Sequence, residues 1–129
     1  MHPAPVLTGP EAEYQRAAGL ARSGNYKEAM TVYRKIVAGP ATVVSADAEF
    51  EIAALYTYYN NPQRDYVQAL AGFEEFIRRY PEHAKVREAR TWQSLLRQVI
   101  ETNRENERLK KNIEQLKNLD IMHEERRRK

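Results

Sequence analysis

The sequence has no cysteine, only 5 glycines and 6 prolines among 129 residues, and no long run of apolar residues. Without cysteine the chain has no disulfide framework, no thiolate zinc site and no cysteine nucleophile. No segment approaches the roughly 20 apolar residues that a membrane-spanning helix requires. The apolar content of 42% is nevertheless near the globular average, and the length suits one domain rather than two.

Positive charge is concentrated at one end of the chain. Residues 1–94 carry equal numbers of basic and acidic side chains, so the net charge of +3 resides in residues 95–129. The cluster Arg126–Lys129 exceeds that net charge by itself. Such a cluster suits the negative end of a helix dipole, and contact with anionic lipid or nucleic acid is the alternative. Because no basic face with interleaved aromatic residues accompanies it, nucleic acid is not the favoured partner.

Residue patterns typical of catalysis are also missing. The three histidines, His2, His83 and His123, share no spacing that forms a local metal site. The chain has no nucleophile elbow, Walker loop or dinucleotide-binding glycine motif. We therefore expect no catalytic residue, no metal and no cofactor, and the chain is not predicted to be an enzyme.

Apolar residues recur at helical spacing, and the helical segments are separated by glycine, asparagine and proline. Helices are predicted at about residues 10–23, 26–38, 45–59 and 66–80. The expected caps are Thr8 for the first helix, Ser45 or Asp47 for the third and Asp65 for the fourth. Since neither proline nor glycine follows Pro81, one long helix is predicted from about His83 to Glu125. No strand pattern competes, so the predicted class is all-α.

The chain also repeats itself when it is shifted by 40 residues. Ala29 then falls on Ala69, and Tyr33 falls on Phe73, so that small residues match small ones and aromatic residues match aromatic ones. A helix-pair repeat of about this length indicates a solenoid, in which each pair buries its apolar face against its neighbour.

Two segments resemble the second half of a tetratricopeptide repeat: Gly24–Ile36 and Asp65–Pro81. Ala17 and Ala53 match the small residue of the preceding helices, and the resemblance covers roughly residues 11–95. The repeats are longer than the usual period of about 34, and the tryptophan typical of the first helix is absent. The resemblance implies an α-α superhelix of two helix hairpins.

The second repeat, Phe73 to Ala89, is also similar to repeats in bacterial envelope lipoproteins, including the tetratricopeptide lipoprotein of the outer-membrane β-barrel assembly machinery. This resemblance implies a cell-envelope location, in the periplasm or attached to the outer membrane, with the cytoplasm as the alternative. It also implies a lipidated cysteine upstream of Pro3, which would be the only link to a membrane.

By position, the tetratricopeptide resemblance further implies a concave partner-binding groove. Its expected lining is Tyr14, Ala18, Ala21, Arg22, Phe50, Ala54, Thr57 and Tyr58. The lysine and asparagine set that clamps a terminal carboxylate in some family members is absent. The expected ligand is therefore an apolar helix or an extended peptide. In the alternative interpretation, the long final helix fills the groove itself with Trp92, Leu95 and Leu96.

The long helix carries a partial coiled-coil seam from Leu95 to Leu116, with steps that alternate between four and three residues. The residues expected to mediate oligomerisation are Val99, Asn106, Leu109, Ile113 and Leu116. Thr102 interrupts the seam, and Asp120 and His123 follow it. Three roles for this helix remain open: it forms a homodimer, it pairs with a helix of another protein, or it is an extension without a partner.

Three regions are therefore expected: a flexible lead-in at residues 1–9, a tetratricopeptide-like domain at 10–96, and an extended helix or coiled coil with a basic tail at 97–129. The expected function is non-catalytic protein–protein interaction, as an adaptor or scaffold in a bacterial cell-envelope complex. The alternatives are a cytoplasmic adaptor or secretion chaperone, and a nucleic-acid or anionic-membrane tether that uses the basic C-terminus.

Overall fold

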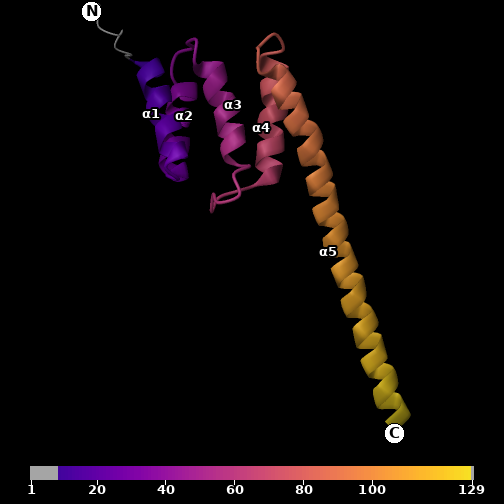
Figure 1. Ribbon diagram of the computed structural model, residues 1–129. Helices are drawn as coiled ribbons and strands as arrows, with labels where there is room; N and C mark the ends of the chain where they lie inside the picture. Colours follow the sequence, from indigo (N-terminus) through magenta and orange to yellow (C-terminus); the bar gives the residue numbers. More distant parts are fainter. Residues whose placement is uncertain (1–8, 129) are drawn as a thin grey trace, which may run out of the picture. The chain divides into compact units, whose positions relative to one another are not determined.

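The computed structural model describes residues 9–128, and this part of the chain is helical without a strand. Its helices are α1 (Pro10–Arg22), α2 (Tyr26–Ala38), α3 (Ser45–Leu55), α4 (Tyr66–Arg79) and α5 (Val86–Arg128), coloured in chain order in Figure 1. The predicted all-α fold with a long C-terminal helix is confirmed. The lead-in up to residue 8, the expected Thr8 cap and Lys129 lie outside the described residues.

Helices α1 and α2 form the first hairpin. Gly24 has a φ of 87° in the short turn between them, a conformation that glycine adopts without steric cost. Ala17 of α1 and Ala29 of α2 are both fully buried, and their small side chains let the two helices approach closely. Tyr33 follows one turn after Ala29 and is 1% exposed, so it fills the space beside the alanine contact.

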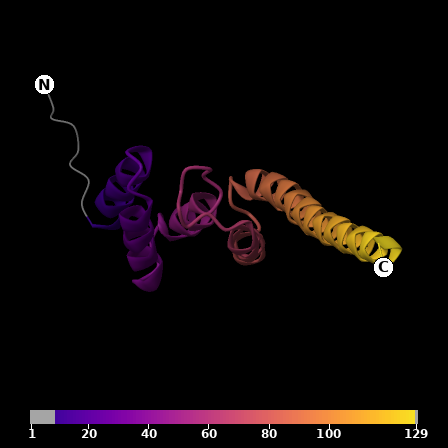
Figure 2. The ribbon, with the colours of Figure 1, turned by 90° about the horizontal axis from the view of Figure 1, so that it is seen from below.

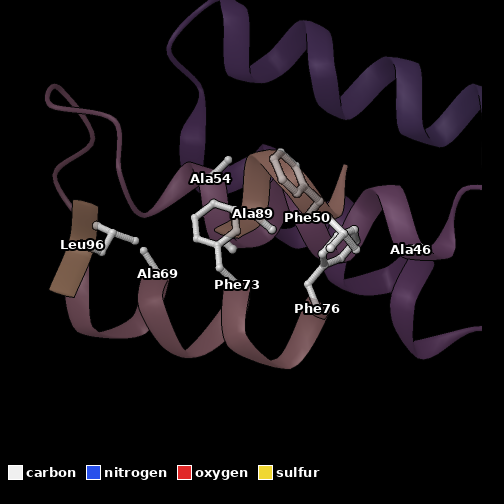
Figure 3. Close-up of a cluster of buried hydrophobic side chains, with 10 residues drawn as sticks. Ala46, Phe50, Ala54, Ala69, Phe73, Phe76, Ala89 and Leu96 are labelled. Carbon is white, nitrogen blue, oxygen red and sulfur yellow. The ribbon is translucent and has the colours of Figure 1, made fainter. Parts of the chain in front are cut away.

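Helices α3 and α4 form the second hairpin, and Figure 2 views α4 almost along its axis beside α3. The two helices lie close together at Gly72, where an added Cβ would lie 2.8 Å from the Cβ of Ala53. Phe73 and Phe76 of α4 point toward Phe50 of α3 (Figure 3), with ring centroids 5.3 Å and 5.5 Å from that of Phe50. Edge-to-face contacts of this kind add to the free energy gained by burying the rings.

Helix α3 ends earlier than the sequence pattern predicts, at Leu55 rather than about Tyr59. The cause is the buried side chain of Asn61, whose amide donates to the Leu55 carbonyl at 2.8 Å. The same side chain accepts from the Gln63 backbone N–H at 3.0 Å, which holds the connection in an ordered turn. A side-chain contact from six residues further along the chain therefore satisfies the last turn of the helix, so the helix does not need to continue to the proline.

Of the two expected caps on described residues, one is confirmed and one is wrong. The Asp65 carboxylate accepts from the Gln68 backbone N–H at 3.0 Å and caps α4 as predicted. Ser45 does not cap α3, because it is the first helical residue and its hydroxyl accepts from the Thr42 backbone N–H at 2.8 Å. Asp47 lies within the first turn of α3, which has no side-chain cap.

Helix α5 begins at Val86 rather than at His83, because the His83 ring belongs to the preceding turn, where its Nδ1 accepts from the Lys85 backbone N–H at 3.0 Å. The helix is 43 residues long and continues past Glu125 to Arg128. At about 1.5 Å per residue it is roughly 65 Å long.

Two compact units divide the chain between Leu96 and Arg97. The first unit contains α1 to α4 and the start of α5, whose Val86, Ala89 and Leu96 are buried in the same core as the phenylalanines of the second hairpin. The second unit is the remainder of α5, in which every described side chain from residue 101 onward is exposed. Within residues 9–128, no helix combines the length and the apolar character needed to cross a bilayer.

Candidate partner-binding groove

The first unit contains an open cavity of about 600 Å³, which we call the tyrosine groove. It is bounded by α1, the first two-thirds of α2, residues 51–60 and the first turns of α5. Its lining residues are Tyr14, Ala18, Ala21, Arg22, Tyr26, Tyr33, Glu51, Thr57, Tyr58, Tyr59, Asn60 and Trp92. Half of them are aromatic, so the groove offers a wide apolar surface with hydroxyl groups along it.

Ring contacts and hydrogen bonds hold four of the five tyrosines of the groove in place, while Tyr59 is 83% exposed. Tyr14 meets Tyr33 edge to face with ring centroids 5.6 Å apart, and Tyr26 lies at the same distance from Tyr58. The Tyr26 hydroxyl also donates to the Asn60 side-chain oxygen at 2.7 Å. Rings that are fixed before binding lose little conformational entropy when a partner arrives.

One carboxylate organises the polar atoms of the groove. Oε1 of Glu51 accepts from the Tyr14 hydroxyl at 3.5 Å and lies 3.4 Å from the Lys85 Nζ. Burial, followed by the nearby Glu51 charge, raises the pKa of Tyr14 to about 12. The same two causes raise the pKa values of Tyr33 and Tyr58 above the ordinary value of 10.0. The single O–H of Tyr14 is already donated to Glu51, and Tyr33 is 1% exposed. Tyr58 is 37% exposed, so its phenol is the one of these three that can donate a hydrogen bond to a ligand.

Of the eight residues expected to line a groove, the structure brings six together and places two elsewhere. Those that line the cavity are Tyr14, Ala18, Ala21, Arg22, Thr57 and Tyr58. The expectation is wrong for Phe50 and Ala54, which are 4% and 7% exposed and belong to the core between α3 and α4. The reason is that α3 turns its apolar stripe toward α4 and ends before Thr57, so the later residues reach the groove from the turn.

The sequence interpretation misses other lining residues. The repeat assigns Tyr26 and Tyr33 to helix packing, and Tyr33 has both roles, since it is buried and forms part of the groove wall. Glu51 is a single charge within the otherwise apolar segment Phe50–Leu55, and that interruption is the available signal. Tyr59 and Asn60 lie in a turn whose path depends on distant contacts, so no sequence signal identifies them.

The first turns of α5 do not fill the groove as the alternative interpretation proposes. Trp92 forms part of its wall and stacks on Phe73, with ring centroids 5.8 Å apart and planes 3° from parallel. Leu96 is instead buried in the core of the second hairpin, and Leu95 is 49% exposed. The cavity therefore remains open with this helix in place.

The oligomerisation residues expected on the long helix are exposed in the second unit. Val99, Leu109, Ile113 and Leu116 have between 38% and 62% of their surface accessible, and Asn106 is exposed among them. Arg126, Arg127 and Arg128 occupy the last turn of α5 and are exposed as well. Among the residues that the structure describes, no group of three or more acidic, histidine or cysteine side chains is arranged to hold a metal ion.

Comparison with known proteins connects this architecture to one family. A search of curated proteins found no match to the chain. The family model YfiO, described as outer membrane lipoprotein, matches residues 8–123. That match covers both helix hairpins, the tyrosine groove and most of α5. It agrees with the likeness to tetratricopeptide lipoproteins of the bacterial envelope that the second repeat carries. The chain therefore belongs to the YfiO family of outer membrane lipoproteins.

Proposed function

We propose that this protein is a non-catalytic adaptor in a bacterial cell-envelope complex, and that the tyrosine groove holds an extended apolar segment of a partner protein. The observation that carries the proposal is the open cavity of about 600 Å³ with five tyrosines and Trp92 in its wall. Tyrosine and tryptophan are the residues that most often dominate binding energy at protein interfaces. The family supports the envelope location, and the adaptor role rests on the groove.

An extended segment suits the groove better than a helix does. The Tyr58 phenol and the Arg22 guanidinium line the groove as hydrogen-bond donors, whereas the Glu51 carboxylate already accepts from Tyr14 and lies beside Lys85. Backbone carbonyls of an extended chain are free to accept from such donors, whereas those within a helix are already satisfied. The apolar side chains of the segment would then cover the aromatic rings.

The only tryptophan of the chain, Trp92, lies in the groove wall and provides a direct readout. The probe is an unstructured peptide of about ten residues, in which valine, leucine and phenylalanine alternate with serine or threonine. Titration should change the Trp92 emission and reach saturation. The same titration is repeated with a stable helical peptide and with a serine-rich peptide of equal length. Tighter binding of the helical peptide would contradict the proposal that the groove holds an extended segment. Equal affinities for all three peptides would contradict a specific groove.

Variants separate the groove from non-specific adsorption. Tyr58→Ala should weaken binding of the extended peptide by roughly tenfold or more, since an interfacial aromatic side chain contributes at least about 1–2 kcal/mol. The matched control is Val67→Ala, which trims a 58% exposed apolar side chain on α4 outside the groove. Equal peptide affinities for the two variants, at unchanged helicity, would contradict the proposal that the groove binds the peptide.

A further inference from the structure

The second unit exposes an apolar row that the groove does not explain. Val99 and Leu109 are 38% and 45% exposed, and Ile113 and Leu116 are 52% and 62% exposed. Together with the polar Thr102 and Asn106 between Val99 and Leu109, these residues follow the alternating steps of three and four that keep one line of side chains on the same side of a helix. Within residues 9–128 nothing covers Leu109, Ile113 and Leu116, because every side chain from residue 101 onward is exposed, and Val99 is exposed just before them.

The types of residue in this row favour a particular assembly. In a heptad register the β-branched Val99 and Ile113 take the a positions, and Leu109 and Leu116 take the d positions. β-branched residues at a with leucine at d favour two parallel strands over three or four. Asn106 occupies the a position between Val99 and Ile113, where an asparagine costs stability but meets its own copy when two identical helices lie parallel and in register.

The charges beside the row complement a second copy of the same helix. Glu105 takes a g position and Lys110 takes the following e position, which face each other across a parallel dimer. The dimer axis repeats this pair, so it would form twice. Within one chain, Glu105 accepts from the Nε of Arg108 at 3.1 Å, and the Nζ of Lys110 lies 3.6 Å from Glu107. Both intrahelical pairs are exposed and contribute little, so they do not prevent the contacts across the dimer.

We propose that the row is covered by a second copy of this chain, as a parallel, in-register, two-stranded coiled coil centred on Asn106 and extending from Val99 to Leu116. Asp120 and His123 take the next seam positions and end it. The proposal does not depend on the groove having a ligand. If both hold, each dimer carries two grooves, and a partner with two suitable segments binds with an avidity that neither groove has alone.

Sedimentation equilibrium of the full chain tests the assembly. The parent should shift from 15.1 kDa toward twice that mass as its concentration rises. Replacing two seam residues together, Leu109→Asp and Ile113→Asp, should weaken association by on the order of a hundredfold or more, because both carboxylates would be buried. The matched control, Gln115→Asp with Asn118→Asp, adds the same charge outside the seam and should retain the dimer. A parent that stays at 15.1 kDa at all concentrations overturns the proposal and favours a partner helix from another protein or an idle extension.

Orientation and register can be tested by cross-linking, because the chain has no cysteine of its own. Leu116→Cys places one thiol at a d position near the end of the seam. In the parallel dimer, the two copies of this thiol meet and should oxidise to a disulfide-linked dimer. Lys111→Cys, at an outward f position, is the control and should remain uncoupled. In an antiparallel dimer centred on Asn106 the two introduced thiols lie far apart, so a dimeric Leu116→Cys variant that does not cross-link overturns the parallel arrangement.

The central asparagine and the flanking pair give two independent checks. Asn106→Ile should tighten association by roughly tenfold or more and admit states larger than a dimer, because the buried polar layer would be lost. Glu105→Lys should weaken association, and adding Lys110→Glu should restore it, since the g and e charges are then exchanged. No effect of Asn106→Ile, or no rescue by the double exchange, would place these residues outside the seam and overturn the register.

Discussion

At the scale of single residues, the hairpins depend on small side chains at the helix contacts. Ala17, Ala29, Ala53 and Ala69 are fully buried, and Gly72 of α4 lies against Ala53 of α3. A larger residue at such a point separates the two helices and disturbs every ring contact beside it.

Gly72→Ala should therefore lower the free energy of unfolding by about 1–3 kcal/mol, because its Cβ would lie 2.8 Å from the Cβ of Ala53. Urea unfolding followed by circular dichroism measures the change. Gly19→Ala is the control, since a Cβ there meets only the end of the Arg22 side chain at 3.7 Å. Alanine in that helix should be neutral or stabilising by up to about 1 kcal/mol. Equal losses at both sites would contradict the close approach at Gly72.

The pKa of Tyr14 predicts a pH dependence of stability. This pKa is about 12 in the folded chain and 10.0 in the unfolded chain, because burial and Glu51 disfavour the phenolate. The stability that the protonated Tyr14 contributes is complete below pH 10 and is lost as the pH rises toward 12, because in the unfolded chain Tyr14 releases its proton at the lower pH. The unfolding free energy should fall over this range, and Tyr14→Phe should make the fall shallower. Part of the fall remains in the Tyr14→Phe variant, because the pKa values of Tyr33 and Tyr58 are raised as well. An unchanged slope would contradict the half-buried position of the Tyr14 hydroxyl beside Glu51.

At the scale of elements, some helix boundaries are set by contacts between residues close in the sequence, and others by contacts with residues beyond the helix. The Asp65 cap is local, since the carboxylate reaches the Gln68 backbone N–H three residues away. Asp65→Ala should lower the free energy of unfolding by about 1 kcal/mol. Asp65→Ser should retain most of the stability, because a hydroxyl can also cap. Thermal or urea unfolding distinguishes the two variants, and equal stability of Asp65→Ala and the parent would show that the cap is not needed.

The same distinction explains how much of the fold follows from the sequence. The existence and order of the helices, the hairpin repeat and the Asp65 cap depend on local periodicity and short-range hydrogen bonds. The early end of α3 depends on the hydrogen bond from the Asn61 side chain to the Leu55 carbonyl, and neither hydrophobic periodicity nor a capping motif predicts that bond. The start of α5 likewise depends on how the His83 ring is held in the turn before it.

The candidate groove can be predicted only in part, for a related reason. The α1 residues that family position assigns to the groove, Tyr14, Ala18, Ala21 and Arg22, do line the cavity. Family position assigns Phe50 and Ala54 to the groove, but the stripe that contains them meets Phe73 and Phe76 of α4. Which of two neighbours an apolar stripe faces is decided by tertiary contacts and not by spacing along one helix.

At the scale of the whole molecule, all buried side chains among residues 9–128 lie at or before Leu96. A chain that ends at Leu96 should therefore retain a cooperative unfolding transition and the Trp92 emission change with the extended peptide. It should also lose self-association, because Val99 to Leu116 are removed. Urea unfolding and sedimentation measure the two properties. Loss of cooperative unfolding would mean that residues 97–129 contribute to the fold of the first unit.

The most direct test of the central claim is a map of backbone amide chemical shifts in the full chain during titration with the extended apolar peptide. We expect perturbations to gather at the tyrosine groove, around Tyr14, Arg22, Thr57 and Trp92, and to saturate with one peptide per chain. The exposed face of α4 around Val67 and residues 101–128 should remain unchanged. Perturbations centred on those other surfaces, or none at saturating peptide, would contradict the claim that this groove receives the partner.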